Sequence, residues 1–534
     1  MRLSQQVSRA VAWNALLAPL KTAVELVANL IILNVLSPPQ FGLIRIIGSA
    51  AASLGTFVDL GIDRSLPRFI PEVEQQAGRG AVAALLRVIF MLKGVLLLVF
   101  GLGFLIFADR FIGYLVDQAH NLPPSRFDAA ARAALESGIL AMAPWLIGTV
   151  LVLVVTGSLY DGLMATLISY FRQRAWNLIG LAGSVVQPLL SAGLVLAGRG
   201  VGGVLFAIVL TPILSVALAA QQVIRYLRGH SEQPPLQTAN APLPWRRFTN
   251  YTAISNLLNL SDYLLSSLFA IFLLNNLADQ ALFGVGTALV RQVLALLYTP
   301  LVGIQVPLFA RVRGGDGTLG EAYAAIGRIL ALLLIPGGVG LTLLALPLVL
   351  IQYPAYADTT IVVYLLTPCL FLESFLSSSQ IVLQVYERYR LLMLTRLPAL
   401  LVFPLLVWIA PRYGLAGVTL AIGGGRVLMG LTATILAWRE LGVNHSWGFI
   451  GRITLAATAM AGVLLGIEAL IGPRWSDPSL TARLLNTGVL LGVAGAGAVA
   501  FFVVLRMLGG LSAEDRRRLL ASKLPLKGVW RRVL

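Results

Sequence analysis

Long apolar runs follow one another along the whole chain, separated by short stretches that contain Pro, Gly and charged residues. Most runs reach the roughly 20 residues that a helix needs to cross the hydrocarbon core of a membrane. They are apolar on all sides, whereas transmembrane β-strands are about 10 residues long and alternate in polarity. The pattern therefore predicts an all-α integral membrane protein with about fourteen transmembrane helices, near residues 9–36, 40–62, 82–107, 138–165, 175–197, 200–226, 248–274, 280–306, 322–350, 358–386, 391–410, 413–438, 449–472 and 484–508.

Composition and the first residues support this interpretation. Of the 534 residues, 58% are hydrophobic and 12% are charged, against roughly 45 to 50% and about 25% in soluble proteins. The basic N-terminus leads into a long helix that carries Lys21 and Glu25, without the compact apolar core and cleavage site of a signal peptide. We therefore expect the first span to be retained.

Basic residues mark one side of the membrane. The net charge is +17, and most Arg and Lys residues fall in alternate loops and in the tail from Arg516 to Arg532. The other loops hold only Arg110, Arg126, Arg132, Arg199, Arg412, Arg474 and Arg483. By the positive-inside rule, both termini are expected in the cytoplasm of a bacterial or archaeal cell, with the chain crossing the inner membrane many times. Because the basic residues are dispersed at helix ends and no soluble domain is predicted, nucleic acid is not expected as a partner.

Two short stretches occur in the same order in each half of the chain. Phe41-Gly42 corresponds to Phe283-Gly284, and residues 200–208 correspond to residues 414–422. Chance similarity between Gly-, Ala- and Leu-rich membrane helices is the alternative. A true repeat predicts two six-helix bundles related by a pseudo-twofold axis, with a central cavity at their interface. The expected division is 1–228 for the first bundle, 229–247 for a cytoplasmic linker, 248–440 for the second bundle, 441–508 for two further helices and 509–534 for a basic cytoplasmic tail.

Several of these segments resemble a known family. Residues 35–42 (VLSPPQFG), 58–61 (VDLG), 67–70 (PRFI), 256–262 (NLLNLSD) and 414–417 (GLAG) are similar to the polysaccharide biosynthesis (Wzx-type) flippases of the multidrug/oligosaccharidyl-lipid/polysaccharide (MOP) exporter superfamily. The likeness covers roughly residues 5–440. The glycine-tyrosine that is usual at the first turn of the family is Phe41-Gly42 here.

The resemblance implies a two-lobed, V-shaped fold with a cationic cavity. It implies a flippase that translocates polyprenyl-diphosphate-linked oligosaccharide during cell-surface polysaccharide biosynthesis. Membrane lipids and polysaccharide assembly proteins are the expected partners beside this substrate. An ion-coupled multidrug exporter of the MATE type, from the same superfamily, is the alternative.

Charged residues inside predicted spans are candidates for function, because each costs about 2.5 to 3.5 kcal/mol at the centre of a membrane helix. They are Lys21, Glu25, Arg45, Asp59, Lys93, Asp262, Arg291, Glu373, Arg396, Arg426 and Glu468. Asp59, Lys93, Arg396 and Glu468 are expected to reach the membrane interface by snorkelling. Lys21 and Glu25 lie four residues apart, so they can pair on one helical face.

Arg45 and Arg291 fall on the same face of helices that the repeat makes equivalent. A guanidinium offers a fork of hydrogen bonds that matches phosphate oxygens, so both are expected to bind the diphosphate, together with Lys21 and Arg426. The alternative is a structural role as helix caps or as partners of Glu25 or Asp262. Glu25, Asp59 and Asp262 are the candidates for coupling to H⁺ or Na⁺.

Several functions lack the residues that they require. There is no G-x-x-x-x-G-K-[ST] segment for ATP, the three histidines are scattered over loops, and Cys369 is the single cysteine. We expect neither a cofactor nor a metal site. A membrane enzyme is disfavoured because the longest predicted external loop, near residues 108–137, holds few candidate catalytic groups.

Overall fold

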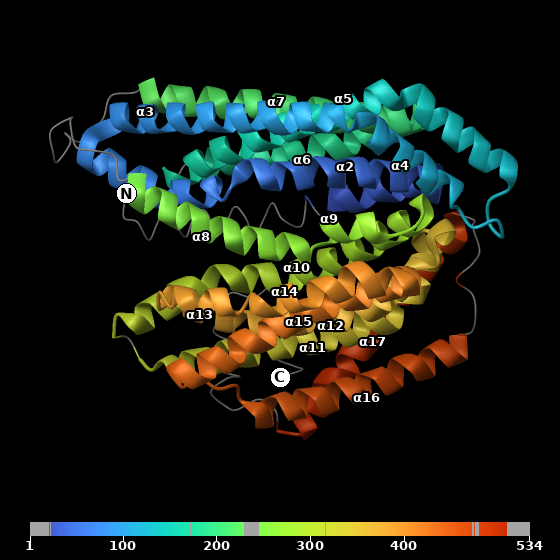
Figure 1. Ribbon diagram of the computed structural model, residues 1–534. Coiled ribbons are helices and arrows are strands. Elements are labelled where there is room, and N and C mark those ends of the chain that lie inside the picture. Colours follow the sequence, from blue (N-terminus) through green and yellow to red (C-terminus); the bar gives the residue numbers. More distant parts are fainter. Residues whose placement is uncertain are drawn as a thin grey trace. The chain divides into compact units, whose positions relative to one another are not determined.

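A computed structural model describes residues 21, 23–170, 173–228, 245–315, 317–471, 475 and 480–509. The described residues are helical and contain no strand, which confirms the predicted all-α membrane architecture (Figure 1). Much of the first predicted span, most of the predicted linker and nearly all of the basic tail lie outside the described residues.

The chain divides into two compact units, Met1–Gly284 (unit 1) and Val285–Leu534 (unit 2). This boundary falls later than the predicted start of the second bundle at residue 248, because the first helices after the linker belong to unit 1. The two six-helix bundles of the sequence repeat therefore stay a prediction.

Unit 1 is built around a long central helix, α5, that packs against α2, α3, α4 and α7. The helices of this unit are α2 (Pro38–Asp59), α3 (Ile62–Ile106), α4 (Ala108–His120), α5 (Ala129–Ser169), α6 (Gln173–Leu196), α7 (Gly200–Arg228), α8 (Trp245–Leu264), α9 (Ser267–Ala270), the short 3-10 helix η1 (Ile271–Leu273) and the start of α10 (Leu277–Arg313).

Unit 2 contains the rest of α10 and a pair of closely packed helices, α12 and α15. Besides α10, its elements are α11 (Leu319–Gln352), η2 (Pro354–Tyr356), α12 (Thr359–Val385), α13 (Tyr389–Leu394), α14 (Leu397–Pro404), η3 (Leu405–Ile409), η4 (Ala410–Tyr413), α15 (Gly414–Leu441), α16 (Trp447–Ile471) and α17 (Leu480–Met507).

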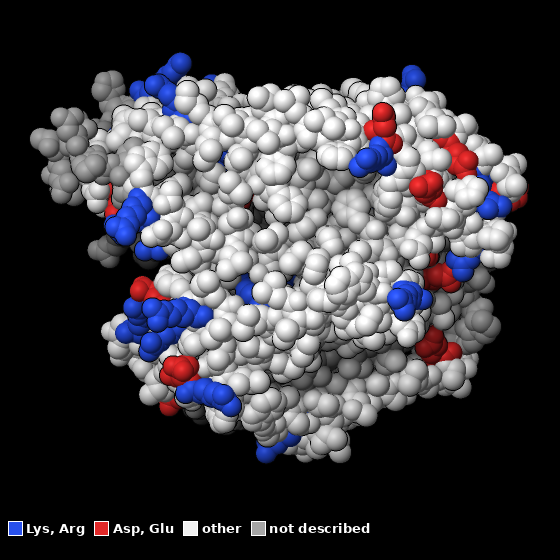
Figure 2. Space-filling model, in the orientation of Figure 1, with Lys and Arg blue, Asp and Glu red and all other residues white. Residues whose placement is uncertain are grey.

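Eleven of the described helices are long and apolar enough to cross a membrane, or twelve if the bent pair of α8 with α9 and η1 forms one span. The segment Tyr389–Leu441 counts as one of them, although its α14 packs back against α15. That packing agrees with the separate helices predicted at 391–410 and 413–438. On the face that Figure 2 shows, most charged side chains of each unit lie towards the ends of its helices, and most of the surface between them is uncharged, as a membrane requires.

The region between residues 62 and 82 differs from the prediction of a loop. It is helical and forms the first part of α3, which then turns back at Gly78 (φ 77°, ψ 178°). The two parts of α3 pack against each other through one buried cluster that includes Ile62, Leu66, Leu86 and Ile89. The charged residues that suggested a loop are accommodated by ion pairs, such as Glu74 with Arg79 at 2.9 Å.

Candidate functional site: two charged clusters

A break in the helical backbone between α2 and α3 organises the first cluster. α2 ends at Asp59, and Leu60 (φ 48°) and Gly61 (φ 78°) take the left-handed conformation before α3 begins at Ile62. The break frees backbone N–H groups that need acceptors. The Asp59 carboxylate accepts hydrogen bonds from Gly61 N–H at 3.2 Å and from Asp63 N–H at 3.1 Å, so it caps the new helix.

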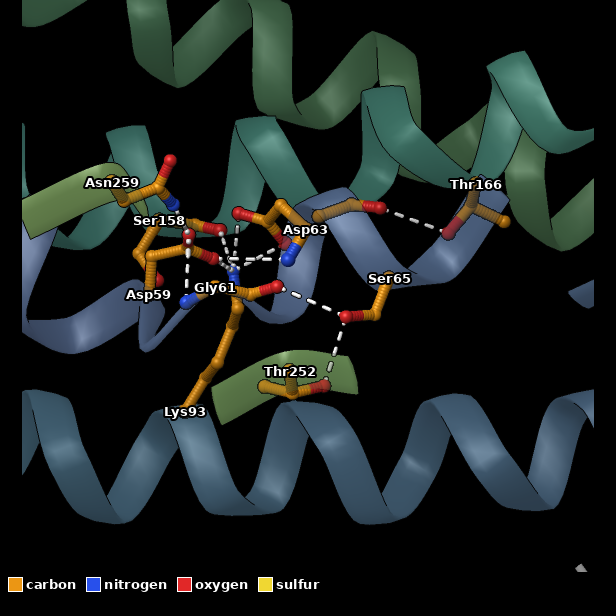
Figure 3. Close-up of polar contacts among 10 residues, drawn as sticks. Asp59, Gly61, Asp63, Ser65, Lys93, Ser158, Thr166, Thr252 and Asn259 are labelled. Atoms are coloured by element: carbon orange, nitrogen blue, oxygen red, sulfur yellow. Dashed lines mark hydrogen bonds and ion pairs between the residues drawn. The ribbon is translucent and has the colours of Figure 1, made fainter. Parts of the chain in front are cut away.

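Lys93 lies at the centre of this cluster. Its side chain is fully buried and reaches from the second part of α3 towards Asp59 and Asp63 (Figure 3). The ammonium donates to both carboxylate oxygens of Asp63 at 2.7 Å and to the Ser158 carbonyl oxygen at 3.1 Å, and it lies 3.6 Å from Asp59 Oδ1. The predicted snorkelling of Lys93 and Asp59 is wrong, because carboxylates on α2 and α3 provide Lys93 with partners inside the unit.

α5 closes the cluster from another side. Asp161 interacts electrostatically with Lys93 and Asp59, and its own side chain is exposed. Gly162 allows the close approach of this helix, since a Cβ atom there would lie 3.3 Å from Asp63 Oδ1. The cluster therefore combines one lysine with three aspartates from α2, α3 and α5.

α8 packs against the break itself. Asn259 donates to Asp59 Oδ2 at 3.4 Å, and the Thr252 and Ser65 hydroxyls share a hydrogen bond of 2.8 Å. A Cβ atom on Gly61 would lie only 2.5 Å from Asn256 N and 2.7 Å from Thr252 O. Both the left-handed backbone and the contact with α8 therefore require glycine at position 61.

Gly61→Ala is expected to lower the stability of the protein by about 1 to 3 kcal/mol, because the new methyl group strains the backbone and pushes α8 away. Thermal unfolding of the purified protein in detergent measures the change. Gly55→Ala in α2 is the matched control, since a Cβ atom there meets nothing within 4 Å. Equal unfolding temperatures for the two variants would contradict the close packing of α8 on the break.

The second cluster belongs to unit 2 and is rich in arginine. Arg426 of α15 forms an ion pair with Glu373 of α12, with Nε 2.8 Å from Oε2. Arg291 of α10 is exposed and interacts electrostatically with both of them. Two turns further along α10, the Tyr298 hydroxyl hydrogen-bonds to Ser377 of α12. With one carboxylate for two guanidinium groups, these three charged residues carry a net positive charge.

Small residues on α15 bring Arg426 close to Glu373. A Cβ atom on Gly423 would lie 2.8 Å from the Cβ atom of Cys369, and one on Gly430 would lie 3.1 Å from the Cβ atom of Leu376. Such glycines allow membrane helices to approach each other closely. The packing of α12 on α15 therefore fixes the positions of the two charged side chains.

The other predicted site residues lie elsewhere. Lys21 and Glu25 form the expected pair, at 3.8 Å. Asp262 pairs with Arg64 at 3.8 Å, on the exposed side of α8. Arg45 donates to the Gly284 carbonyl oxygen at 2.9 Å and lies over the Phe41 ring. Arg45 belongs to unit 1 and Arg291 to unit 2, so their shared role in one substrate site stays a prediction.

The fold resembles that of solved membrane flippases and transporters, some of them from the MOP superfamily. The chain is similar in structure to the lipid II flippase MurJ in an inward closed conformation, with a TM-score of 0.65 and 12% identity, over 92% of this chain and 99% of that one. It is also similar to an inward-facing MATE family multidrug resistance transporter of the MOP superfamily, with a TM-score of 0.55 and 14% identity, over 79% of this chain and 94% of that one.

A MOP superfamily transporter from Pyrococcus furiosus, whose binding pocket is described as having reverse polarity, gives a TM-score of 0.51 and 14% identity over 83% of this chain and 98% of that one. No protein-family model matches the sequence. No curated protein matches it either. At these identities the likeness establishes the fold alone. The eleven or twelve described helices that are long and apolar enough to cross a membrane indicate a multi-pass membrane protein.

Proposed function

We propose that the protein is a flippase that translocates polyprenyl-diphosphate-linked oligosaccharide across the membrane. The observation that carries the proposal is the arginine cluster of unit 2, in which exposed Arg291 lies near the Arg426–Glu373 ion pair. A guanidinium is charged at every physiological pH and hydrogen-bonds to phosphate oxygens in pairs. The fold shared with a lipid II flippase adds support, because lipid II is itself a lipid-linked substrate.

A cation-coupled multidrug exporter is the second candidate. It is favoured by the MATE transporters among the structural neighbours and by the excess of carboxylates around Lys93 in unit 1. The two candidates differ in substrate charge, since an exporter of cationic drugs would be hindered by the net positive cluster of unit 2. We therefore place the flippase first.

Arg291→Ala and Arg45→Ala are each expected to reduce transport of the lipid-linked oligosaccharide strongly. A charge-assisted hydrogen bond contributes about 1.5 to 3 kcal/mol, which corresponds to about 10- to 150-fold in affinity. Lysine at either position should restore transport only in part, because a point charge lacks the fork of donors. The measurement is transport in proteoliposomes, normalised to the amount of inserted protein.

Arg110→Ala provides the control, because Arg110 is an exposed arginine of α4 whose guanidinium lies over the Phe107 ring. Normal transport by both alanine variants would refute the cationic site. Transport of cationic drugs by the wild-type protein, without transport of the lipid-linked oligosaccharide, would favour the exporter.

A further inference from the structure

The cluster around Lys93 contains more negative than positive charge. Asp63 of α3 and Asp59 of α2 contact one ammonium, and the exposed Asp161 of α5 interacts with it electrostatically. The nearby basic residue Arg64 pairs with Asp262, and from α8 it is the neutral amide of Asn259 that reaches Asp59. Uncompensated charge in a low-dielectric interior is costly. The cluster is therefore suited to take up an additional positive charge.

A second observation points to the same place. Ser158 is 5% exposed, and no described residue hydrogen-bonds to its hydroxyl. The carbonyl group of the same residue accepts from Lys93. A buried polar group without a partner costs about 1 to 3 kcal/mol. A buried hydroxyl without a partner among the described residues therefore lies on the residue whose carbonyl group contacts Lys93.

The cluster also lies at a discontinuity of the backbone. Its members Asp59 and Asp63 flank Leu60 and Gly61, where α2 gives way to α3 through two consecutive left-handed residues. Broken membrane helices commonly carry the ion sites of transporters, because the break exposes backbone groups and can change its angle. A change of charge beside this break can therefore change the direction of α3 relative to α2.

We propose that the Asp59–Asp63–Lys93 cluster is a proton-binding site whose occupancy sets the geometry of the break between α2 and α3. A proton adds to the Asp63 carboxylate and forms an O–H bond, so the charge-assisted contact with Lys93 weakens. The ammonium keeps its own protons and remains beside Asp59. The inference rests on the proposed transport function, to which it adds proton coupling as the energy source.

The geometry favours a proton over a metal cation. Lys93 Nζ already lies 2.7 Å from both oxygens of Asp63, which is where a sodium ion would bind. A metal ion would face the ammonium directly, whereas a proton neutralises a carboxylate without placing a second cation in the same space.

The test uses a conformational readout that does not depend on substrate. In the full-length chain, Cys369→Ser removes the single cysteine, and Thr56→Cys, one turn before the break, carries a fluorophore whose emission does not depend on pH. Iodide quenching of the label in proteoliposomes reports its exposure to water as the pH is varied. The wild-type cluster should give a sigmoidal change with pH. Asp63→Asn mimics the protonated carboxyl group and should fix quenching at the low-pH level.

Three control variants test whether the change in quenching comes from the cluster. Asp117→Asn removes an exposed carboxylate of α4, outside the cluster, and should leave the titration unchanged. Asp161→Asn, at an exposed position, should fold even if Asp63→Asn does not, and should move the midpoint to lower pH because it removes a neighbouring negative charge. A label on Ala133→Cys at the start of α5 should show no sigmoidal change.

Transport measurements distinguish a failure of the proton-binding proposal from a failure of the proposed flippase function. In the wild type, a pH gradient should accelerate uptake of the lipid-linked oligosaccharide, and in Asp63→Asn the rates with and without the gradient should become equal. A titration lost in Asp63→Asn would support proton binding even if that substrate is not transported. Quenching that responds to Na⁺ at constant pH, or that titrates equally in wild type, Asp63→Asn and Asp161→Asn, would overturn the proposal.

Discussion

Lys93→Met is expected to lower the free energy of unfolding by about 3 to 5 kcal/mol at neutral pH, because it leaves buried carboxylates without their cation. The Lys93 side chain is fully buried and contacts both Asp63 and Asp59. The loss should become smaller as the pH falls, since protons then neutralise the carboxylates. Unfolding of the purified protein in mixed micelles, titrated with a denaturing detergent, measures the effect.

The double variant Lys93→Met with Asp63→Asn tests whether the two side chains act on each other. Removing the carboxylate charge should recover part of the loss, so the two changes should not add. Arg64→Met is the matched control from the same helix, because the pair of Arg64 with Asp262 is exposed and such pairs contribute about 0 to 1 kcal/mol. Equal losses for Lys93→Met and Arg64→Met would show that the buried cluster does not stabilise the fold.

The membrane spans were largely predictable because they depend on the composition of local windows. The predicted spans 358–386 and 449–472 correspond to helices Thr359–Val385 and Trp447–Ile471. Each helix must satisfy its own backbone hydrogen bonds and present an apolar surface to lipid. These requirements leave a signal in about 20 consecutive residues, whatever the rest of the chain does.

The charged clusters were predictable only in part, because their contacts join residues far apart in the sequence. Lys93 was identified as a costly charge, yet its contact with Asp63 depends on the turn at Gly78, and its contact with Ser158 depends on the packing of α3 on α5. Asp63 fell in a stretch interpreted as a loop. One signal was present: Asp63 and Lys93 lie the same number of residues before and after Gly78, as expected for two side chains that face each other across a helical hairpin.

The arginine cluster was likewise predictable only in part. Arg291 and Arg426 were both named from the sequence. In the structure, Arg426 pairs with Glu373, and Arg291 interacts electrostatically with both residues. The alignment of repeated segments could place Arg45 and Arg291 on equivalent helices but could not supply their neighbours. In unit 1, Arg45 bonds to the backbone of Gly284, a contact to which the side-chain pattern of the sequence gives no clue.

A buried histidine in unit 2 is expected to make the protein acid-sensitive. His445 lies between α15 and α16, is 5% exposed, and shares a hydrogen bond of 2.9 Å with the Tyr323 hydroxyl through Nε2. Burial lowers the pKa of His445 to about 4, from its ordinary value of 6.5. The folded protein therefore holds the imidazole neutral over a range of pH in which the unfolded chain protonates it.

This difference in pKa gives the sign and the range of the effect. The stability is fully present above pH 6.5 and falls as the pH decreases towards 4, because the unfolded state then binds more protons. The whole difference in pKa corresponds to about 3 kcal/mol in the free energy of unfolding.

His445→Gln, which can still hydrogen-bond to Tyr323 but does not titrate, should have lower stability at neutral pH and a weaker decline between pH 6.5 and 4. Unfolding measured across this range tests it, with His120→Gln as the control because His120 is exposed on α4 beside Glu136. An unchanged acid decline in His445→Gln would assign the sensitivity to other groups.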